Sequence, residues 1–281
     1  MRVARLEVQM LLQHVLRVSR AWLLAHPEHE LSVTDAASYL ALMHRRLAGE
    51  PMAHILGERE FFGLNFKVTP DTLIPRPETE LLVELALARI PPRGGFRVLD
   101  LGTGSGAIAL SIAHMRPDAT VTAVDTSQSA LLVARENAQR LGTSNTEFVQ
   151  SDWFSALAGQ RFDLIVSNPP YIASDDIHLQ QGDVRHEPRS ALESGTDGLD
   201  DIRRIICGAT GYLEQDAWLL LEHGYDQAAR VRGDLYESGY REVFTTEDMA
   251  GIDRVSGGVN ARYACGNKDP AKSDKDGGLK V

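Results

Sequence analysis

Cysteine is almost absent from this sequence: Cys207 and Cys265 are the only two, far apart and outside any CxxC spacing. A disulfide-built fold needs several paired cysteines, and a cysteine-based zinc site needs closely spaced ones. The nine histidines are scattered without metal-ligand spacing. The sequence therefore predicts neither a disulfide framework nor a metal site, and it favours a reducing, cytoplasmic setting.

Long hydrophobic runs and an excess of positive charge are also lacking. The apolar stretch Met10–Leu12 is followed by Gln13, His14 and Arg17, so it is neither the core of a signal peptide nor a membrane span. Lys and Arg number 29 against 39 Asp and Glu, a net charge of -10. Proteins that hold nucleic acid through its phosphates usually carry the opposite excess. The composition argues against membrane and nucleic-acid partners, although a local basic groove stays open.

The first 50 residues have the pattern of a small all-helical domain. The 281 residues, 43% of them hydrophobic, suffice for one large domain and a small one. Apolar side chains recur at helical spacing over residues 3–25, and residues 32–35 form a capping box for a second helix. Gly49 and Pro51 end that helix. We therefore expect a helical domain over residues 1–50.

Residues 51–76 have the pattern of a linker that contains a β-hairpin. Leu64, Phe66 and Val68 alternate with polar residues, which is the period of a half-buried strand. The preceding stretch Glu60–Gly63 supplies a candidate partner strand. We expect the hairpin to join the helical domain to the rest of the chain.

From Pro77 onward, short apolar strands alternate with helices. The strands are expected at 97–101, 120–125, 147–150, 163–167 and 218–222, and the helices between them at 107–115, 129–141 and 199–212. This alternation requires crossover connections, so it predicts a doubly wound, mainly parallel α/β domain over residues 77–265. Residues 266–281 are rich in Lys, Asp and Gly, and we expect a disordered tail there.

A glycine-rich turn follows the strand expected at 97–101. Its residues are Gly102, Thr103, Gly104, Ser105 and Gly106. Glycines let the backbone turn sharply and approach a ligand closely. The next expected strand ends at Asp125, whose carboxylate can accept both hydroxyls of a ribose or else cap the following helix. Dinucleotide enzymes use the same device, so these features predict a nucleoside cofactor without identifying it.

Two further residues favour a nucleoside pocket. Asp152 and Trp153 directly follow the third expected strand. They offer a hydrogen-bond acceptor and an aromatic wall for an adenine. A tryptophan belongs to a protein core at least as often, so by themselves they leave both readings open.

The tetrapeptide Asn168-Pro169-Pro170-Tyr171 follows the strand expected at 163–167. Its prolines cannot donate to a strand ladder, and they fix the backbone so that the Asn168 side chain and adjacent carbonyls face outward. Ligands bind at this end of parallel strands. The tetrapeptide therefore predicts a substrate site and favours a methyl donor over a dinucleotide, against the alternative of a simple loop terminator.

Together these motifs resemble the protein-(glutamine-N5) methyltransferases of peptide-chain release factors, the HemK-like or PrmC group. The similarity extends from about Leu11 to Tyr263. It also includes GEREFFGL at 57–64, LIPRPETE at 73–80, SDWF at 151–154 and EHG at 222–224. The linked series is more specific than the tetrapeptide, which adenine-N6 methyltransferases share.

The resemblance implies a seven-stranded Rossmann-like methyltransferase sheet, S-adenosylmethionine as cofactor and release factors as protein substrate, in translation termination. It implies that Gly102 to Gly106, Asp125 and Asn168 hold the cofactor, with Trp153 at the adenine. It also implies that the glutamine of the Gly-Gly-Gln motif is received by four residues: Asn168, Pro169, Pro170 and Tyr171.

Two departures from the family pattern stand out. By the resemblance, the helical domain helps to select the substrate, and we expect it to begin late, without the family's usual first helix, which leaves its affinity for the substrate open. Residues 213–217 read Leu-Glu-Gln-Asp-Ala where the family commonly has a Pro-Gly-Gly turn. We expect only a changed turn there.

Methylation of an amide sets a chemical problem, because the nitrogen lone pair is delocalised into the carbonyl. The side-chain oxygen of Asn168 and the main-chain carbonyl of Pro169 can accept the two amide N–H bonds and align the nitrogen for in-line attack. Positive charge moves to the nitrogen during transfer, so these acceptors stabilise the transition state more than the ground state. Tyr171 is expected to pack on the amide plane.

Three alternatives remain from the sequence. An adenine-N6 nucleic-acid methyltransferase would carry a basic face, whereas the long stretch 172–198 is acidic. An NAD-dependent oxidoreductase would leave the tetrapeptide unexplained, and a binding module without activity would not need the intact motifs. The roles of Glu78, Glu80 and His223 and the oligomeric state stay open, with a monomer as the expectation.

Overall fold

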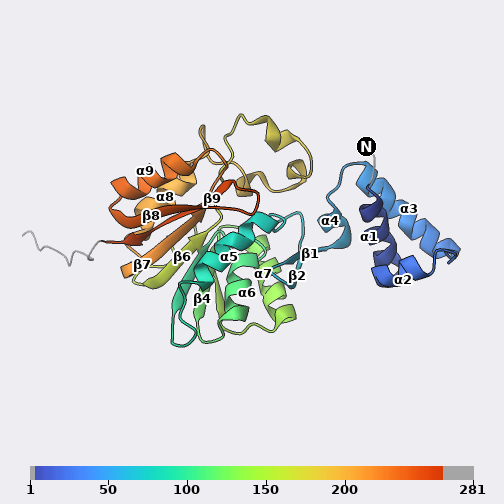
Figure 1. Cartoon of the computed structure of the whole chain (residues 1–281), viewed down its shortest axis with the longest axis horizontal. Helices are drawn as coiled ribbons and strands as arrows, with labels where there is room; N and C mark the ends of the chain where they lie inside the picture. The colour runs from blue at the N-terminus through green and yellow to red at the C-terminus, as the bar shows by residue number, and fades with distance from the viewer. Residues whose placement is uncertain (1–3, 262–281) are drawn as a thin grey trace, which may run out of the picture.

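The computed structural model describes residues 4–261. Its N-terminal part consists of helices α1 (Arg5–Leu16), α2 (Arg20–Ala25) and α3 (Val33–Leu47), followed by the short helix α4 (Met52–Leu56). These helices form a lobe beside the sheet domain (Figure 1). Residues 262–281, which include the tail expected to be disordered, lie outside the described residues.

Residues 5–25 form two helices and not the one that the apolar spacing predicts. Arg17 adopts a left-handed conformation with φ 54°, and the N–H of Val18 bonds back to the carbonyl of Gln13. Ser19 then caps α2, because its hydroxyl accepts from the N–H of Trp22 at 3.2 Å. Apolar spacing alone does not register such a break, since the capping hydroxyl is a local signal independent of the apolar period. Ser32 caps α3 as expected, its hydroxyl accepting from the N–H of Asp35; the Asp35 carboxylate accepts from that hydroxyl and not from the Ser32 N–H that a full capping box requires.

Arg46 ties the helical lobe together. Its side chain is only 8% exposed, and its Nε donates to Glu7 of α1 at 2.9 Å. Nη1 donates to the carbonyl of Glu50 and to Asp183, which lies far along the chain. A charged group at this depth is stabilised only while these partners are present.

We expect Arg46→Ala to lower the local stability of the lobe by about 2 kcal/mol, because it removes charge-assisted hydrogen bonds and leaves Glu7 without its partner. Hydrogen exchange of the α1 amides measures this opening free energy. Arg45→Ala is the matched control, since the exposed pair of Arg45 with Glu50 is worth about 1 kcal/mol or less. Equal effects of the two substitutions would contradict the role assigned to Arg46.

The linker carries the expected hairpin, with strands β1 (Glu58–Phe61) and β2 (Leu64–Lys67) paired antiparallel. The buried Asn137 of helix α7 holds β2 to the sheet domain. It accepts from the N–H of Lys67 at 2.7 Å and donates to the carbonyls of Lys67 and Ser105. The hairpin is thereby fixed beside the glycine turn.

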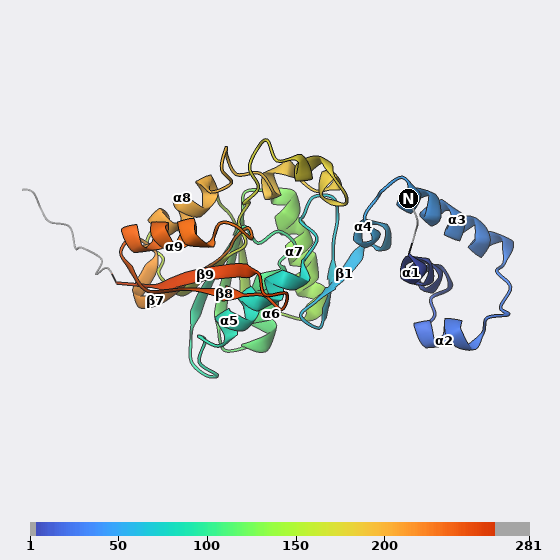
Figure 2. The same ribbon diagram turned by 45° about the horizontal axis from the view of Figure 1, so that its top comes forward.

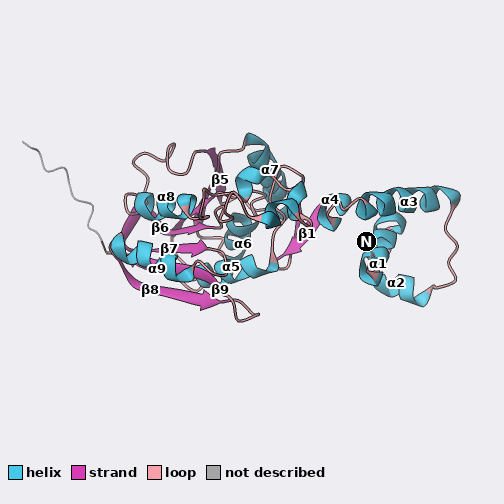
Figure 3. Ribbon diagram, turned by 90° about the horizontal axis from the view of Figure 1, so that it is seen from above, coloured by secondary structure: helices cyan, strands magenta, loops and turns pink. Residues whose placement is uncertain are grey.

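The second domain is built on a seven-stranded sheet of order β5-β4-β3-β6-β7-β9-β8; strands are magenta in Figure 3. The strands are β3 (Arg97–Leu101), β4 (Thr120–Asp125), β5 (Thr146–Gln150), β6 (Phe162–Ser167), β7 (Leu213–Glu222), β8 (Tyr240–Glu247) and β9 (Asp253–Asn260). The first five in chain order are parallel to one another, whereas β9 is antiparallel to both β7 and β8. The predicted mainly parallel sheet is confirmed.

Helices cover both faces of this sheet, which makes it doubly wound. Helices α5 (Glu80–Leu87), α6 (Ala107–Met115) and α7 (Gln128–Leu141) lie on one face, and α8 (Asp200–Ala209) and α9 (Ala228–Glu237) on the other. Alternate strand residues divide between the two cores: Val98 packs with α5 and α6, and Leu99 with α8. Burial on both faces explains the continuous apolar runs of the central strands.

Two predicted boundaries are wrong near the end of the chain. The helix predicted at 199–212 is the shorter α8, and β7 begins at Leu213, five residues before the strand predicted at 218–222. The changed turn expected at 213–217 is an irregular stretch inside this strand, where Asp216 has φ 60° and the register against β6 shifts. Among residues 4–261, no helix is both long and apolar enough to cross a bilayer.

Candidate active site

A cavity of about 380 Å³ opens at the carboxyl ends of the parallel strands, within the size range of ligand pockets. Predicted residues that line it are Gly102, Gly104, Asp125, Asp152, Trp153, Asn168 and Pro170. Five other predicted residues belong to the same loops but are not among those lining it: Thr103, Ser105, Gly106, Pro169 and Tyr171. The structure therefore brings both predicted motifs to one cavity.

The glycine turn is a left-handed backbone segment between β3 and α6. Gly102, Gly104 and Gly106 have φ 73°, 55° and 84°, conformations that other residues adopt only with strain. A Cβ on Gly106 would lie 3.2 Å from the Cβ of Ala134 on α7, so this glycine permits close packing of α6 against α7. Thr103 turns its hydroxyl inward to Asp100 at 2.7 Å. The backbone of Gly102 and Gly104 is left to form the cavity floor.

Asp125 spans the turn from the end of β4. One carboxylate oxygen accepts from the N–H of Gly104 and the other from the N–H of Ser127, both at 2.9 Å. Burial raises the pKa of this carboxyl. The cap of helix α7 is Ser127, whose hydroxyl accepts from Ala130, so the alternative that Asp125 caps the helix is wrong. The Asp125 side chain also lines the cavity.

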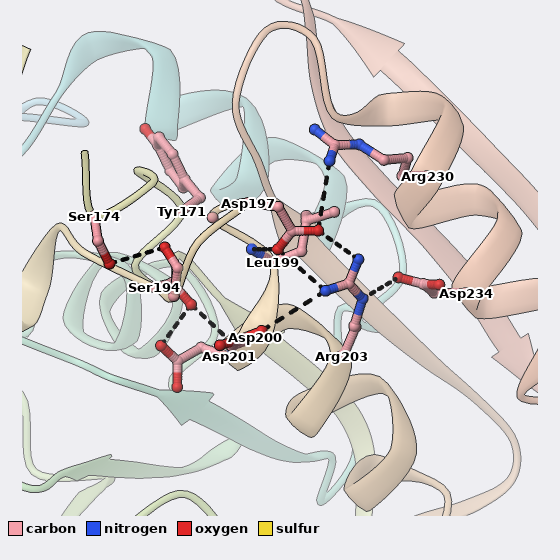
Figure 4. A network of polar contacts seen from close by, with 12 residues as sticks. Tyr171, Ser174, Ser194, Asp197, Leu199, Asp200, Asp201, Arg203, Arg230 and Asp234 are labelled. Atoms are coloured by element: carbon pink, nitrogen blue, oxygen red, sulfur yellow. Dashed lines mark hydrogen bonds and ion pairs between the residues drawn. The ribbon is translucent and has the colours of Figure 1, made fainter. Parts of the chain in front are cut away.

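Trp153 forms a wall of the cavity beside Gly102. A Cβ at Gly102 would lie 3.5 Å from the indole ring, and the indole N–H donates to Asp201 of α8 at 3.2 Å. Asp201 in turn accepts from the hydroxyl of Ser194 at 2.7 Å (Figure 4). These bonds fix the ring plane. One oxygen of the Asp152 carboxylate, Oδ2, pairs with Arg204 at 2.7 Å.

The Asn-Pro-Pro-Tyr segment directly follows β6, the neighbour of β3 in the sheet. The Asn168 Nδ2 donates to the hydroxyl of Thr79 at 3.2 Å, which leaves its Oδ1 as an acceptor. The Tyr171 hydroxyl donates to Glu222 at 3.3 Å. Burial, together with the nearby Glu222 charge, raises the pKa of Tyr171, so this phenol stays protonated.

Ion pairs anchor the end of the long loop 172–198, which leads from the Asn-Pro-Pro-Tyr segment to α8 (Figure 4). Asp197 pairs with Arg203 at 2.7 Å and with Arg230 at 3.6 Å. Next to it, Gly198 has φ 74°, and a Cβ there would lie 2.4 Å from the carbonyl oxygen of Tyr171. This close approach requires glycine and holds the backbone of Tyr171 in place.

Two segments that the sequence did not assign to the site also line the cavity: residues 70–73, and the stretch that carries Pro188, Ser190 and Ala191. The ion pair between Arg76 and Glu187 joins them, with Arg76 Nη2 at 2.7 Å and 2.8 Å from the two carboxylate oxygens. The second of these segments belongs to the long loop 172–198, which is the yellow segment above the sheet in Figure 2, on the side of α4. Because Arg76 and Glu187 are 111 positions apart, no local sequence pattern indicates that they are in contact.

The three residues left open by the sequence have structural partners or lie at the surface. Glu78 is exposed, and Glu80 accepts from the N–H of Phe62 at 2.9 Å, so it holds the turn of the hairpin. The buried His223 uses both ring nitrogens. Because the carbonyl of Gly224 only accepts, Nδ1 carries the proton and Nε2 accepts from Ser256. Burial lowers the pKa of His223, which keeps the ring neutral.

Comparison with known proteins shows the family of this chain. The family model "Methyltransferase small domain" matches residues 78–195 and "PrmC N-terminal domain" matches residues 2–57. A release factor glutamine methyltransferase of Bordetella pertussis is 55% identical over 255 residues, covering 90% of this chain and 94% of that protein. The one of Escherichia coli is 49% identical over 252 residues, covering 90% and 91%.

A crystal structure of a methyltransferase from Pyrococcus furiosus has the same fold, with a TM-score of 0.55 at 20% identity, covering 78% of this chain and 98% of that one. The doubly wound sheet and the matching domain define the chain as a Rossmann-like methyltransferase. More narrowly, it belongs to the release factor glutamine methyltransferase family, because relatives about half identical cover nearly all of it. The family decides against the oxidoreductase alternative.

Proposed function

We propose that this protein transfers a methyl group from S-adenosylmethionine to the side-chain amide nitrogen of the glutamine in the Gly-Gly-Gln motif of peptide-chain release factors. The observation that carries the proposal is the position of Asn168. Its Oδ1 is left free to accept, on a cavity that the glycine turn and Asp125 also line. The names of the close relatives give the substrate class.

The cavity residues fit an adenosyl cofactor. Asp125 offers lone pairs for the two ribose hydroxyls, Gly102 and Gly104 leave room for close approach, and Trp153 supplies a fixed aromatic wall. The pocket is shaped by the whole turn, Gly102, Thr103, Gly104, Ser105 and Gly106, and Asn168 also lines it. The bound cofactor supplies an electrophilic methyl group on a sulfonium.

The Asn-Pro-Pro-Tyr segment binds and orients the substrate amide. Asn168 Oδ1 and the main-chain carbonyl of Pro169 accept the two N–H bonds of the substrate amide and orient its nitrogen. As positive charge develops on that nitrogen, the acceptors bind it more strongly, which lowers the barrier. Pro170 fixes the backbone, and Tyr171 packs on the amide plane. The proton lost after transfer passes to a neighbouring acceptor or to water.

We expect Asp125→Ala to weaken binding of S-adenosylmethionine about 10- to 100-fold, because one hydrogen bond to a charged group is worth roughly 1.5–3 kcal/mol. Isothermal titration calorimetry with S-adenosylhomocysteine measures the change. Asp118→Ala is the control, because Asp118 is exposed before the opposite end of the same strand. An unchanged dissociation constant for Asp125→Ala would remove this residue from the cofactor site.

The direct test is incubation of the purified protein with labelled S-adenosylmethionine and a release factor, followed by peptide mass mapping. We expect one methyl group on the glutamine of the Gly-Gly-Gln motif and none on a release factor in which that glutamine is replaced. Transfer to DNA or RNA in place of the protein would overturn the proposal. We expect the enzyme to act as a cytoplasmic monomer without a nucleic-acid partner, which light scattering and a binding assay with RNA check.

A further inference from the structure

Glu222 is a buried carboxylate that the proposed mechanism does not use. Glu222 is the last residue of β7, the strand next to β6 and its Asn-Pro-Pro-Tyr segment, and it is 1% exposed. One oxygen, Oε1, accepts from the Tyr171 hydroxyl, and the Thr79 hydroxyl lies close enough to the side chain to favour its ionised form. Oε2 has no hydrogen-bond partner among the described residues. A carboxylate is costly to bury, so its retention at this place needs a reason.

The hydrogen-bond directions give that reason. Asn168 Nδ2 donates to the Thr79 oxygen, so the single Thr79 hydrogen is free to be donated onward. An ionised Glu222 only accepts: it takes the hydrogen of Tyr171, and its unpaired, buried Oε2 is the acceptor available to the Thr79 hydrogen. The chain of bonds then has one direction, from the Asn168 amide through Thr79 to Glu222.

We propose that Glu222 is a positioning residue that sets the Asn168 amide, through Thr79, with its oxygen toward the substrate, and that fixes Tyr171 at the same time. The inference rests on the proposed function, since it explains how Asn168 and Tyr171 are kept ready for the substrate amide. Without an acceptor at Glu222, the Thr79 hydrogen is free to turn to Asn168 Oδ1. The Asn168 amide then presents N–H groups where the substrate needs an acceptor.

The charges around Glu222 make this arrangement depend on pH. Arg254 of β9 favours the ionised form, whereas Glu78 and burial oppose it, and the balance raises the pKa of Glu222 to about 7. Tyr171, the other titratable neighbour, stays protonated in this range. Below the pKa of Glu222 the side chain carries its own hydrogen, and the one-way chain of bonds is lost.

The test compares variants of the full-length enzyme in single-turnover methylation of a release factor. Glu222→Gln replaces half of the acceptor by a donor, and Thr79→Val removes the hydroxyl that joins it to Asn168. We expect both to lower the turnover rate about 10- to 100-fold through misplacement of the amide, with unchanged affinity for S-adenosylhomocysteine. Thr79→Ser keeps the hydroxyl and should retain the rate. Glu214→Gln is the matched control, at the other end of the same strand.

The pH profile separates positioning from a general structural role. The wild-type rate should fall as the pH is lowered through about 7, and Glu222→Gln should lack this fall. Full turnover in Glu222→Gln, or weakened cofactor binding with an unchanged pH profile, would overturn the inference. Either result leaves the proposed function standing if the wild-type enzyme methylates the glutamine, whereas an inactive wild-type enzyme would overturn the proposed function itself.

Discussion

Replacement of Asn168 by alanine is expected to lower kcat by about 10²- to 10³-fold at saturating S-adenosylmethionine, the loss typical of removing one positioned hydrogen-bonding group from a transition state. The side chain carries the acceptor that Thr79 leaves free. Because this acceptor acts mainly on the charge that develops during transfer, kcat should change more than KM. Steady-state kinetics with a release factor measure both constants.

The control for this substitution is Asn65→Ala, which removes an exposed asparagine from β2 outside the cavity. It should leave kcat and KM unchanged. Binding of S-adenosylhomocysteine to Asn168→Ala should remain measurable, because Asp125 and the glycine turn are intact. A variant that keeps full turnover would show that another group orients the substrate amide.

Replacement of Arg76 by alanine is expected to destabilise the fold by about 3–5 kcal/mol at pH 8, because it leaves a buried carboxylate without its partner. The Glu187 side chain has 0% exposure and lies 2.7 Å from Arg76. Since the neighbouring Pro188, Ser190 and Ala191 line the cavity, affinity for S-adenosylhomocysteine should fall as well. Urea denaturation and calorimetry measure the two effects.

The pH dependence of this loss identifies its cause. Burial raises the folded-state pKa of Glu187 from 4.5 to about 7, so the folded protein binds a proton between these values that the unfolded chain releases. Its contribution to stability is largest at low pH and is lost as the pH rises through about 7. The Arg76→Ala loss should therefore be smaller at pH 5.5 than at pH 8.

Two further variants complete this test. Adding Glu187→Gln to Arg76→Ala should recover much of the stability, because the uncompensated charge is gone. Lys67→Ala breaks the exposed pair with Glu136 and should cost about 1 kcal/mol or less at either pH. A loss in Arg76→Ala that is the same at both pH values, or that Glu187→Gln does not relieve, would contradict the role of this pair.

The central strands were predictable because their signals are local. The strands expected at 97–101 and 120–125 agree with β3 and β4, since burial on both faces produces short apolar runs next to turn residues. The antiparallel strands β8 and β9 gave no such signal. Gly257 and Gly258 weaken the strand pattern of β9, yet a Cβ on Gly257 would lie 2.5 Å from the carbonyl oxygen of Leu219. Packing against β7 therefore requires a residue that the local pattern disfavours.

The sequence by itself determined the doubly wound domain, the glycine turn, Asp125 and the Asn-Pro-Pro-Tyr segment, because each depends on backbone conformation within a few residues. Only the tertiary structure decided the partners of these groups. Thr79 reaches Asn168 across 89 positions and Arg76 reaches Glu187 across 111. Such contacts arise because parallel strands bring distant loops to one edge of the sheet, and a buried hydrogen bond depends on that meeting and not on neighbours in sequence.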